Sequence, residues 1–546
     1  MKKNTIVSCL FAFFIIASAQ AQMNPKIKLQ DALKLIQDNY VDPVNDEQVV
    51  DAAIKAMLSS LDPHSSYISR EEVEAMNEQM TGSFAGIGIS FAMVADSTFI
   101  TGINPDGPAA RAGLQVGDRI NTVDGASIFG KNLKNQDVMR MLRGEKGKAV
   151  KLGVIRKLQP TPLEFNVMRE QIAELSINTS YMVSKNVGYI SLAVFSQSTR
   201  REMDAALKKL KALGMTKLIL DLQSNGGGLV EAAIGVADEF LPQDKLVFYS
   251  VTNSGVKDNY LTGGFGQFMT GDLVVLIDES TASSSEILTG ALQDWDRAVV
   301  IGRRSFGKGL MQKGLELSDG SVIRLTAARY YTPSGRSIQK PYAKGKTDYF
   351  EDFNRRMASG ELTQGGHINF PDSLKHTTLI NKRTVYGGGG IMPDKFIPID
   401  TALYSGWLNK LMNSGRVTQA AFSYVQENRK SLTDKYADFD AFNQSFKVDE
   451  RMIDQIMTSA IKQGIKLPSV TDQIARKTIA VELKAEMADM CYLGKGYALR
   501  VRNEASTAFG TALNILNNQK IYNQFLEAKS LTNTSSSSKS TKKNNL

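Results

Sequence analysis

Cysteine is scarce in this sequence. The chain has 546 residues and only two cysteines, Cys9 and Cys491. Cys9 lies in an N-terminal leader that we expect to be removed, which leaves Cys491 without a partner in the mature chain. We therefore expect no internal disulfide. A chain of this length spans about three or four domains and can bury enough apolar surface to be stable without one.

Apolar runs long enough to span a membrane are missing after the N-terminus. The first 21 residues combine a positive start, "MKKN", an apolar segment, "CLFAFFIIA", and small residues at Ala19 and Ala21. This pattern predicts a secretory signal peptide over residues 1–21, with an uncleaved anchor as the alternative. We expect an exported protein of the periplasm or cell envelope, with no integral membrane segment once the leader is removed. Peripheral attachment to the membrane stays open.

Clusters of basic residues are also missing. The formal net charge is +9, and part of it comes from Lys2 and Lys3 in the leader and from three lysines in the polar tail of residues 530–546. Proteins that bind nucleic acids carry basic stripes or patches. Because this sequence has neither, we expect no nucleic-acid partner.

Histidine is rare as well, with His64, His367 and His376 the only three in the chain. His64 falls in a turn of the N-terminal helical part, and the other two fall in a polar stretch typical of a surface insertion. This distribution does not favour a Ser-His-Asp triad, although distance along the sequence does not exclude one. A nucleophile in this chain would then need a different base.

The spacing of apolar residues divides the chain into regions. Residues 22–80 have helical periodicity, with Asn45 as an N-cap and a turn over residues 61–69. Residues 81–160 form a small domain of short strands and two short helices. Residues 171–400 alternate strands with helices, which predicts a layered α/β core. Residues 401–529 form a helical extension, in which the apolar stripe at residues 452–461 is typical of a core, and residues 530–546 form a disordered tail.

Two turns in the predicted α/β core have unusual compositions. The turn "DLQSNGGG", residues 221–228, ends in three glycines that let backbone amides approach a bound atom, and a predicted helix follows it. It could bind a phosphate or an oxyanion, although no Gly-Lys-Ser/Thr follows as in a phosphate loop. The turn "STASSSEI", residues 280–287, has four serines between a predicted strand and a predicted helix. A serine there most often only caps the helix.

A lysine is the best candidate for a base. Lys308 lies between Gly307 and Gly309 at the start of a predicted strand, and Gln312 follows four residues later. At strand periodicity the two side chains project to the same face, so the amide could position the amine. If it is buried, Lys308 would have a lowered pKa and could act as a neutral base. The simpler alternative is a solvated loop lysine.

At these residues the sequence resembles the carboxy-terminal processing proteases, also called tail-specific proteases. The resemblance covers residues 30–400. It is carried by "NYVDPV", "SSLDPHSSYIS", "GSFAGIGISF", "GPAARAGLQVGDRINTVDG", "LILDLQSNGGG", "STASSSEILTGALQDWDRAVVIGRRSFGKGLMQ", "YYTPSGRSIQ" and "YGGGGIMPD". It implies a secreted serine endopeptidase with a Ser-Lys dyad and no cofactor or metal. The fold class is then an α/β catalytic core over residues 171–400 with an inserted PDZ domain over residues 81–160, an N-terminal helical segment and a C-terminal helical extension.

The resemblance also implies roles for individual residues. Ser283, two residues before the Ser-Glu pair, is the implied nucleophile, Lys308 is the implied base, and Gln312 is the implied residue that orients it. The implied oxyanion hole uses the amide of Ser284 and one glycine amide, for which we select Gly227. Three positions depart from the family pattern. Ser284 stands where alanine is usual, Gln223 stands where arginine is frequent, and Gly226 stands where proline is frequent.

The implied PDZ domain predicts how substrates are recognised. The residues Gly86, Ile87, Gly88 and Ile89 would present backbone amides to the free C-terminus of a protein or peptide, which then adds to the edge of a sheet. An ordinary glycine hairpin is the alternative. The sequence leaves open an adaptor and a homo-oligomer. It also leaves open a non-catalytic or partner-activated PDZ scaffold, and a different hydrolase, such as an esterase, that uses the same dyad.

Overall fold

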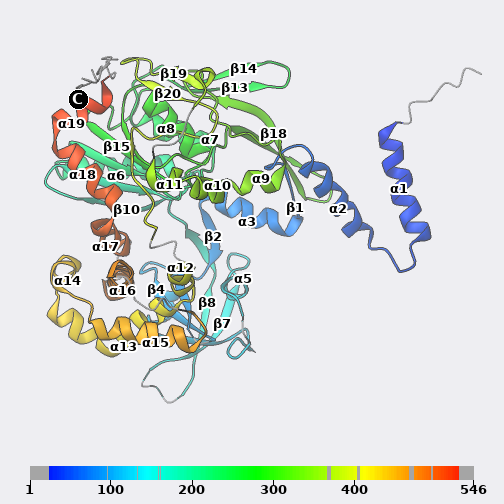
Figure 1. Ribbon diagram of the computed structural model, residues 1–546. Helices are drawn as coiled ribbons and strands as arrows, with labels where there is room; N and C mark the ends of the chain where they lie inside the picture. The colour runs from blue at the N-terminus through cyan, green and yellow to red at the C-terminus, as the bar shows by residue number, and fades with distance from the viewer. Residues whose placement is uncertain are drawn as a thin grey trace, which may run out of the picture. The chain divides into compact units, whose positions relative to one another are not determined.

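The structure, a computed structural model, describes residues 24–94, 96–131, 133–157, 159, 161–365, 370–401, 406–466, 473–492 and 496–527 (Figure 1). The expected signal peptide, the expected disordered tail and His367 lie outside these residues. The described part divides into two compact units at residues 61 and 62. The first unit contains two helices, α1 (Pro25–Asn39) and α2 (Asp46–Ser59). As predicted, Asn45 caps α2, and its side chain accepts a hydrogen bond from the Gln48 amide.

A six-stranded sheet forms the centre of the second unit. Its strands follow the order β10-β11-β12-β15-β16-β21, with β10 and β11 antiparallel and the others parallel. The strands are β10 (Ile177–Met182), β11 (Val187–Leu192), β12 (Lys217–Asp221), β15 (Asp272–Ile277), β16 (Val299–Gly302) and β21 (Lys395–Phe396).

Helices cover both faces of this sheet. On one face, Leu218 and Leu220 pack against α6 (Thr199–Ala212), α7 (Val230–Asp238) and α8 (Ser284–Asp294). On the other face, the alternate residue Ile219 packs against α18 (Thr507–Asn517) and α19 (Gln519–Leu526) (Figure 1). Because both faces are buried, the central strands β15 and β16 are almost continuously apolar. The C-terminal extension therefore supplies one layer of the α/β core.

A second sheet adjoins the core and has five strands. The order β1-β18-β13-β14 is extended by β17, which pairs with β18. The strands are β1 (Ser66–Ile68), β13 (Leu246–Thr252), β14 (Lys257–Leu261), β17 (Leu310–Glu316) and β18 (Val322–Tyr331). The turn predicted over residues 61–69 is wrong at Ser66–Ile68. Those three residues form a strand because they pair with β18, far away in the sequence.

The small domain has its own sheet and its own core. Its sheet follows the order β3-β4-β5-β7-β8, so β3 is an edge strand, and β6 pairs with β5. The elements are β3 (Ile89–Val94), β4 (Ser97–Ile103), α4 (Pro108–Ala112), β5 (Arg119–Val123), β6 (Ala126–Ser127), α5 (Asn135–Leu142), β7 (Ala149–Ile155) and β8 (Leu163–Met168). A ribbon of β2 (Ser83–Gly86) and β9 (Glu170–Ala173) flanks them. This sheet extends past residue 160, since β8 completes it.

Most of the C-terminal helices enclose a separate core. The helices are α12 (Gly406–Asn413), α13 (Arg416–Lys435), α14 (Phe439–Ser445), α15 (Glu450–Lys462), α16 (Gln473–Tyr492) and α17 (Tyr497–Ala505). The stripe predicted on α15 is part of this core, since Ile453, Ile456, Met457 and Ala460 are buried. The small domain contacts the same core through Phe99, whose ring lies 4.9 Å from that of Phe422.

Short elements complete the described chain. They are α3 (Arg70–Thr81), α9 (Lys346–Phe350), α10 (Asp352–Ala358), α11 (Glu361–Gln364), the 3-10 helix η1 (Asp372–Leu374), β19 (Lys375–Thr377) and β20 (Thr384–Tyr386). None of the helices in the described part of the chain is long and apolar enough to cross a membrane.

Candidate active site

Ser283 occupies a strained position between β15 and α8. Its φ is +57° and its ψ is −117°, and it is the N-cap of α8. A residue other than glycine rarely adopts positive φ, because its Cβ approaches the backbone, and such strain is concentrated at functional sites. The turn thus holds the half-buried Ser283 side chain at the carboxyl end of a central strand and at the positive end of a helix.

One buried carboxylate connects Ser283 to Lys308. Oε2 of Glu286 accepts hydrogen bonds from the backbone amides of Ser283 and Lys308, each at 2.9 Å. Oε1 accepts from the Gly307 amide at 2.7 Å and from the Ser305 hydroxyl at 2.5 Å. Burial raises the pKa of Glu286 despite these donors. The turn with Ser283 and the loop with Lys308 are therefore fixed to the same side chain.

A tyrosine hydroxyl contacts the same two residues on their carbonyl side. The Tyr330 hydroxyl lies 2.9 Å from the carbonyl oxygen of Lys308 and 3.3 Å from that of Ser283, within donating distance of both. Tyr330 is buried, and burial raises its pKa well above the ordinary value, so the hydroxyl keeps its proton. Glu286 and Tyr330 together hold the backbone of both residues from two sides.

The Lys308 amine is half-buried and oriented by Gln312. Lys308 Nζ donates to Gln312 Oε1 at 3.0 Å, and Gln312 Nε2 donates to the carbonyl oxygen of His64 at 2.7 Å. Burial, followed by the charge of Arg324, lowers the pKa of Lys308, while the charges of Glu286 and Asp62 act in the opposite direction. Lys308 is therefore not a solvated loop lysine, and its environment favours the neutral amine.

His64 belongs to this site in a way that sequence reasoning missed. Its carbonyl oxygen holds Gln312, and its ring Nε2 lies 2.8 Å from the Tyr349 hydroxyl. Burial, followed by the charge of Lys308, lowers the pKa of His64 to about 4, so the ring is neutral at neutral pH. The family-like segment "LDPHSSYIS" is the signal that could have placed His64 here.

The glycine turn is anchored by two carboxylates at strand ends. Asp221 accepts from the Gln223 amide at 2.9 Å, and Asp278 accepts from the Ser224 amide at 3.0 Å. Burial raises the pKa of Asp221 to about 6. The structure brings this turn against Ser283, because a Cβ built on Gly227 would lie 2.8 Å from the Ser283 Cβ and 2.9 Å from the Ser284 nitrogen.

The Gly227 amide already has a partner in this conformation. It donates to Oδ1 of Asn225 at 2.8 Å. The Ser284 amide is in the first turn of α8, where amides have no acceptor within the helix. The Ser284 hydroxyl donates a hydrogen bond to the Gly228 carbonyl at 2.8 Å. The Ser285 hydroxyl donates to the Asn225 carbonyl at 2.9 Å. The serines that follow Ser283 thus fasten one turn to the other.

The residues selected in the small domain lie apart from Ser283 and Lys308. Gly86 ends β2, Ile87 is buried in the core of the small domain, and Gly88 has φ +75° just before the edge strand β3, which starts at Ile89. The Gly88 and Ile87 carbonyls accept hydrogen bonds from the amides of Asn104 and Ala109. Gly88 and Ile89 also line a pocket of ≈ 460 Å³ whose far wall comes from α16.

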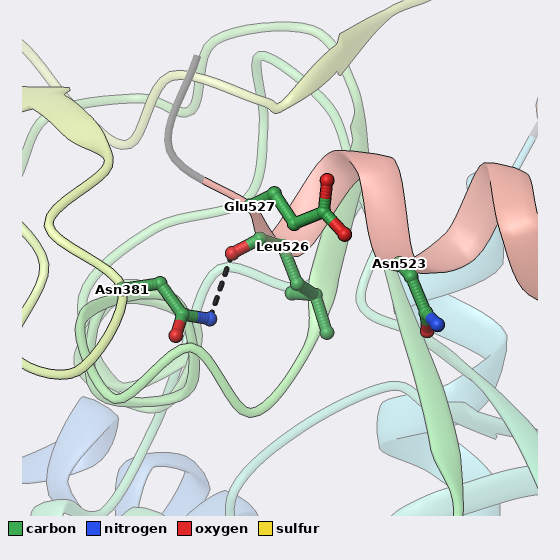
Figure 2. A pocket seen from close by; sticks show the side chains of 4 residues that line it. All are labelled: Asn381, Asn523, Leu526 and Glu527. Carbon is green, nitrogen blue, oxygen red and sulfur yellow. Dashed lines mark hydrogen bonds between the residues drawn. The ribbon is translucent and has the colours of Figure 1, made fainter. Parts of the chain in front are cut away.

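A further hollow is lined by Asn381, Asn523, Leu526 and Glu527. It lies where the end of α19 meets the loop around Asn381 (Figure 2). The Asn381 side chain donates to the Leu526 carbonyl at 2.7 Å, which satisfies a carbonyl at the C-terminal end of α19. Asn381 therefore caps α19, and we do not interpret the hollow beside it as a reaction site. No group of side chains suited to hold a metal ion occurs among the described residues.

Family models match most parts of the chain. Residues 186–347 match peptidase family S41, residues 99–156 match the PDZ domain, and residues 16–72 match the N-terminal domain of the activating protease CtpB. Residues 407–493 match a family of unknown function. The fold predicted from the sequence, an α/β core with a PDZ domain and helical regions on either side, is thereby confirmed.

Known proteins with similar sequences carry related names. The carboxy-terminal-processing protease of Bartonella bacilliformis is 37% identical over 321 residues, which cover 57% of this chain and 71% of that protein. The probable CtpA-like serine protease of Staphylococcus haemolyticus is 32% identical over 355 residues, which cover 64% of this chain and 70% of that protein. Among solved structures, the photosystem II D1 C-terminal processing protease is 28% identical, with coverage of 57% of this chain and 90% of that chain and a TM-score of 0.34.

Proposed function

Because this chain belongs to the family of carboxy-terminal processing proteases and is a serine-type peptidase, we propose that Ser283 and Lys308 form its catalytic dyad. The observation that carries the proposal is the arrangement around Glu286, whose Oε2 accepts from the amides of both residues while Gln312 holds the Lys308 amine. A nucleophile and its base need this kind of mutual positioning.

The proposed reaction is peptide hydrolysis through an acyl-enzyme. Neutral Lys308 Nζ accepts the proton of Ser283 Oγ as that oxygen attacks the carbonyl carbon of the scissile bond. The tetrahedral intermediate then expels the amine, which takes the proton from Lys308. Lys308 next removes a proton from a water molecule that attacks the ester, and returns it to Ser283 Oγ when the ester bond breaks. The products are a new carboxylate and a new amine.

Backbone amides would stabilise the oxyanion of both intermediates. We assign this role to the amide of Ser284 and to Gly227, the latter on condition that the substrate oxygen takes the place of Asn225 Oδ1. Donors of this kind commonly contribute about 3–4 kcal/mol to transition-state stabilisation. The hydrogen bonds from the Ser284 and Ser285 hydroxyls to the glycine turn support this assignment, because they fasten the glycine turn to the turn that carries Ser283.

Substrates would be recognised by their C-terminal tails. The PDZ domain offers β3 as an edge strand, and residues 86–89 lead into it. An extended tail can pair with β3 while its carboxylate meets the amides of this loop. We also propose that the protein acts after export, in the periplasm or cell envelope, in keeping with the sequence pattern of residues 1–21.

The dyad is tested with an unstructured peptide that ends in a free carboxylate. Ser283→Ala and Lys308→Arg should abolish cleavage, because alanine has no nucleophile and arginine stays protonated. Ser280→Ala and Lys313→Ala are matched controls at exposed positions in the same two segments and should cleave normally. Wild-type cleavage by Ser283→Ala would refute the assignment. Amidation of the peptide C-terminus should weaken binding and cleavage, and equal rates for both peptides would refute tail recognition.

A further inference from the structure

Arg324 lies on the same face of the second sheet as Gln312. In the pairing of β17 with β18, Gln312 is opposite Thr326 and Gly314 is opposite Arg324. Paired residues and residues two apart along a strand project to the same side of a sheet. Gln312 binds the Lys308 amine, so Arg324 lies on the strand that pairs with the strand of Gln312, close to the proposed base. Gly314, the residue opposite Arg324, has no side chain.

Arg324 has no acidic partner in the part of the chain that the structure describes. Within the residues that the structure describes, no ion pair includes Arg324, and its Nε is buried without a hydrogen-bond partner. Lys340, another cation that acts on His64, differs in this respect because its Nζ lies 3.4 Å from Asp352 Oδ2. A buried donor without a partner destabilises the folded state, so its presence calls for an explanation.

The charges around Lys308 come from three directions. Arg324 of β18 opposes a positive charge on Lys308, whereas Glu286 of α8 and Asp62, which precedes β1, favour it. Both carboxylates are already engaged by donors, Glu286 by four and Asp62 by the amides of His64 and Ser65 and by the Ser65 hydroxyl. The His64 ring is neutral at neutral pH. Arg324 is therefore the cation that counters the two carboxylates at Lys308.

We propose that Arg324 is a positioning residue whose unpaired guanidinium acts through space on Lys308 and favours the neutral amine that accepts the Ser283 proton. The inference rests on the proposed role of Lys308 as the base. It assigns a function to a charge that no contact within the fold explains. A cation next to an active-site amine favours its neutral form because the protonated form is repelled.

The direct test is a titration of Lys308 in Ser283→Ala protein, where turnover is not needed. Lysine amines are labelled by reductive ¹³C-methylation, and the Lys308 signal is the one that Lys308→Arg removes. Its titration midpoint should move to higher pH in Arg324→Gln and stay in place in Arg324→Lys. Arg329→Gln removes an exposed charge from the same strand and should leave it in place. An unchanged midpoint in Arg324→Gln overturns the proposal.

The second readout is the pH profile of kcat/KM with an uncharged peptide. Since neutral Lys308 is the active form, Arg324→Gln should shift the acidic limb to higher pH, with a loss roughly threefold or more greater at pH 6 than at pH 9. An equal loss of kcat/KM at every pH would indicate that Arg324 has only a structural role. If the glutamine variant does not fold, Arg324→Met keeps the apolar stem and undergoes the same tests. Should Ser283→Ala prove fully active, the proposed function fails, while the titration still reports on Arg324.

Discussion

Alanine substitutions at Gly226 and Gly227 should have opposite effects, although the two residues are adjacent. Gly227 is buried at φ +100°, and its new Cβ would lie 2.8 Å from the Ala282 carbonyl oxygen and 2.8 Å from the Ser283 Cβ. Gly226 is exposed and outside the left-handed region, and its new Cβ would have no heavy atom within 4 Å.

The magnitudes follow from these distances. At Gly227 a side chain costs about 1–2 kcal/mol for the left-handed backbone, and moving the serine turn away adds about 1–3 kcal/mol. Gly227→Ala should therefore lower the free energy of unfolding by about 2–5 kcal/mol. At Gly226 the alanine restricts only the unfolded chain, so Gly226→Ala should raise it by about 0.4–1 kcal/mol.

Activity should separate the two variants further. The Cβ at Gly227 pushes directly on Ser283 and on the Ser284 amide, and a displacement of about 1 Å in an active site commonly costs a factor of about 100 in rate. We expect such a loss of kcat/KM in Gly227→Ala and nearly normal kcat/KM in Gly226→Ala. Urea unfolding and peptide cleavage measure both effects. Equal stability and activity in the two variants would refute the packing of the glycine turn against Ser283.

Three further predictions concern side chains around the proposed dyad. Tyr330→Phe removes the hydroxyl that contacts the carbonyls of Ser283 and Lys308. It should lower stability by about 1–2 kcal/mol and reduce kcat more than it changes KM. Tyr331→Phe is the control, and an unchanged kcat in Tyr330→Phe would contradict the role of that hydroxyl. His64 has a pKa lowered from 6.5 to about 4, so the unfolded state binds more protons between these values and wild-type stability should fall as pH drops from 6.5 to 4. His64→Gln should reduce that dependence in urea titrations at both pH values, and an identical dependence would be evidence against burial of the ring. Ser284→Ala removes the hydrogen bond to Gly228 and should lower stability, measured by thermal unfolding, by about 1 kcal/mol. Peptide cleavage should be retained, because the backbone amide remains. Loss of cleavage would show that the hydroxyl is needed as well as the amide.

Periodicity predicted the main elements because it reflects burial. The alternating strands and helices of the α/β core and the apolar stripe on α15 both occur as expected. The strand Ser66–Ile68 could not be predicted, because three residues show no period and their pairing with β18 is a tertiary event. The packing of α18 on the sheet was also missed, since a helical pattern does not say what it covers.

Only part of the candidate site could be predicted from the sequence. From composition alone, Ser283 would be interpreted as a helix cap and Lys308 as a loop residue. The resemblance to a family selected the two as a pair. Glu286 and Tyr330 gave no signal as hydrogen-bonding partners of that pair, because they lie within a regular helix and a regular strand of mixed composition. Hydrogen bonds to the backbone depend on how segments meet, which local patterns do not encode.

The bridging by Glu286 and Gln312 has a consequence for folding. Gln312 binds the His64 carbonyl across 248 residues of sequence, and Glu286 joins two further segments. The contact of Gln312 with His64 should form late, because the entropy of closing a large loop is lost before the contact is gained. The contacts of Glu286 are local by comparison and span at most 22 residues. A partly folded molecule therefore contains Ser283 but lacks the contact that fixes Gln312 beside the Lys308 amine. We expect the chain to gain hydrolytic activity only when folding is complete, so that its partly folded copies do not cleave other chains.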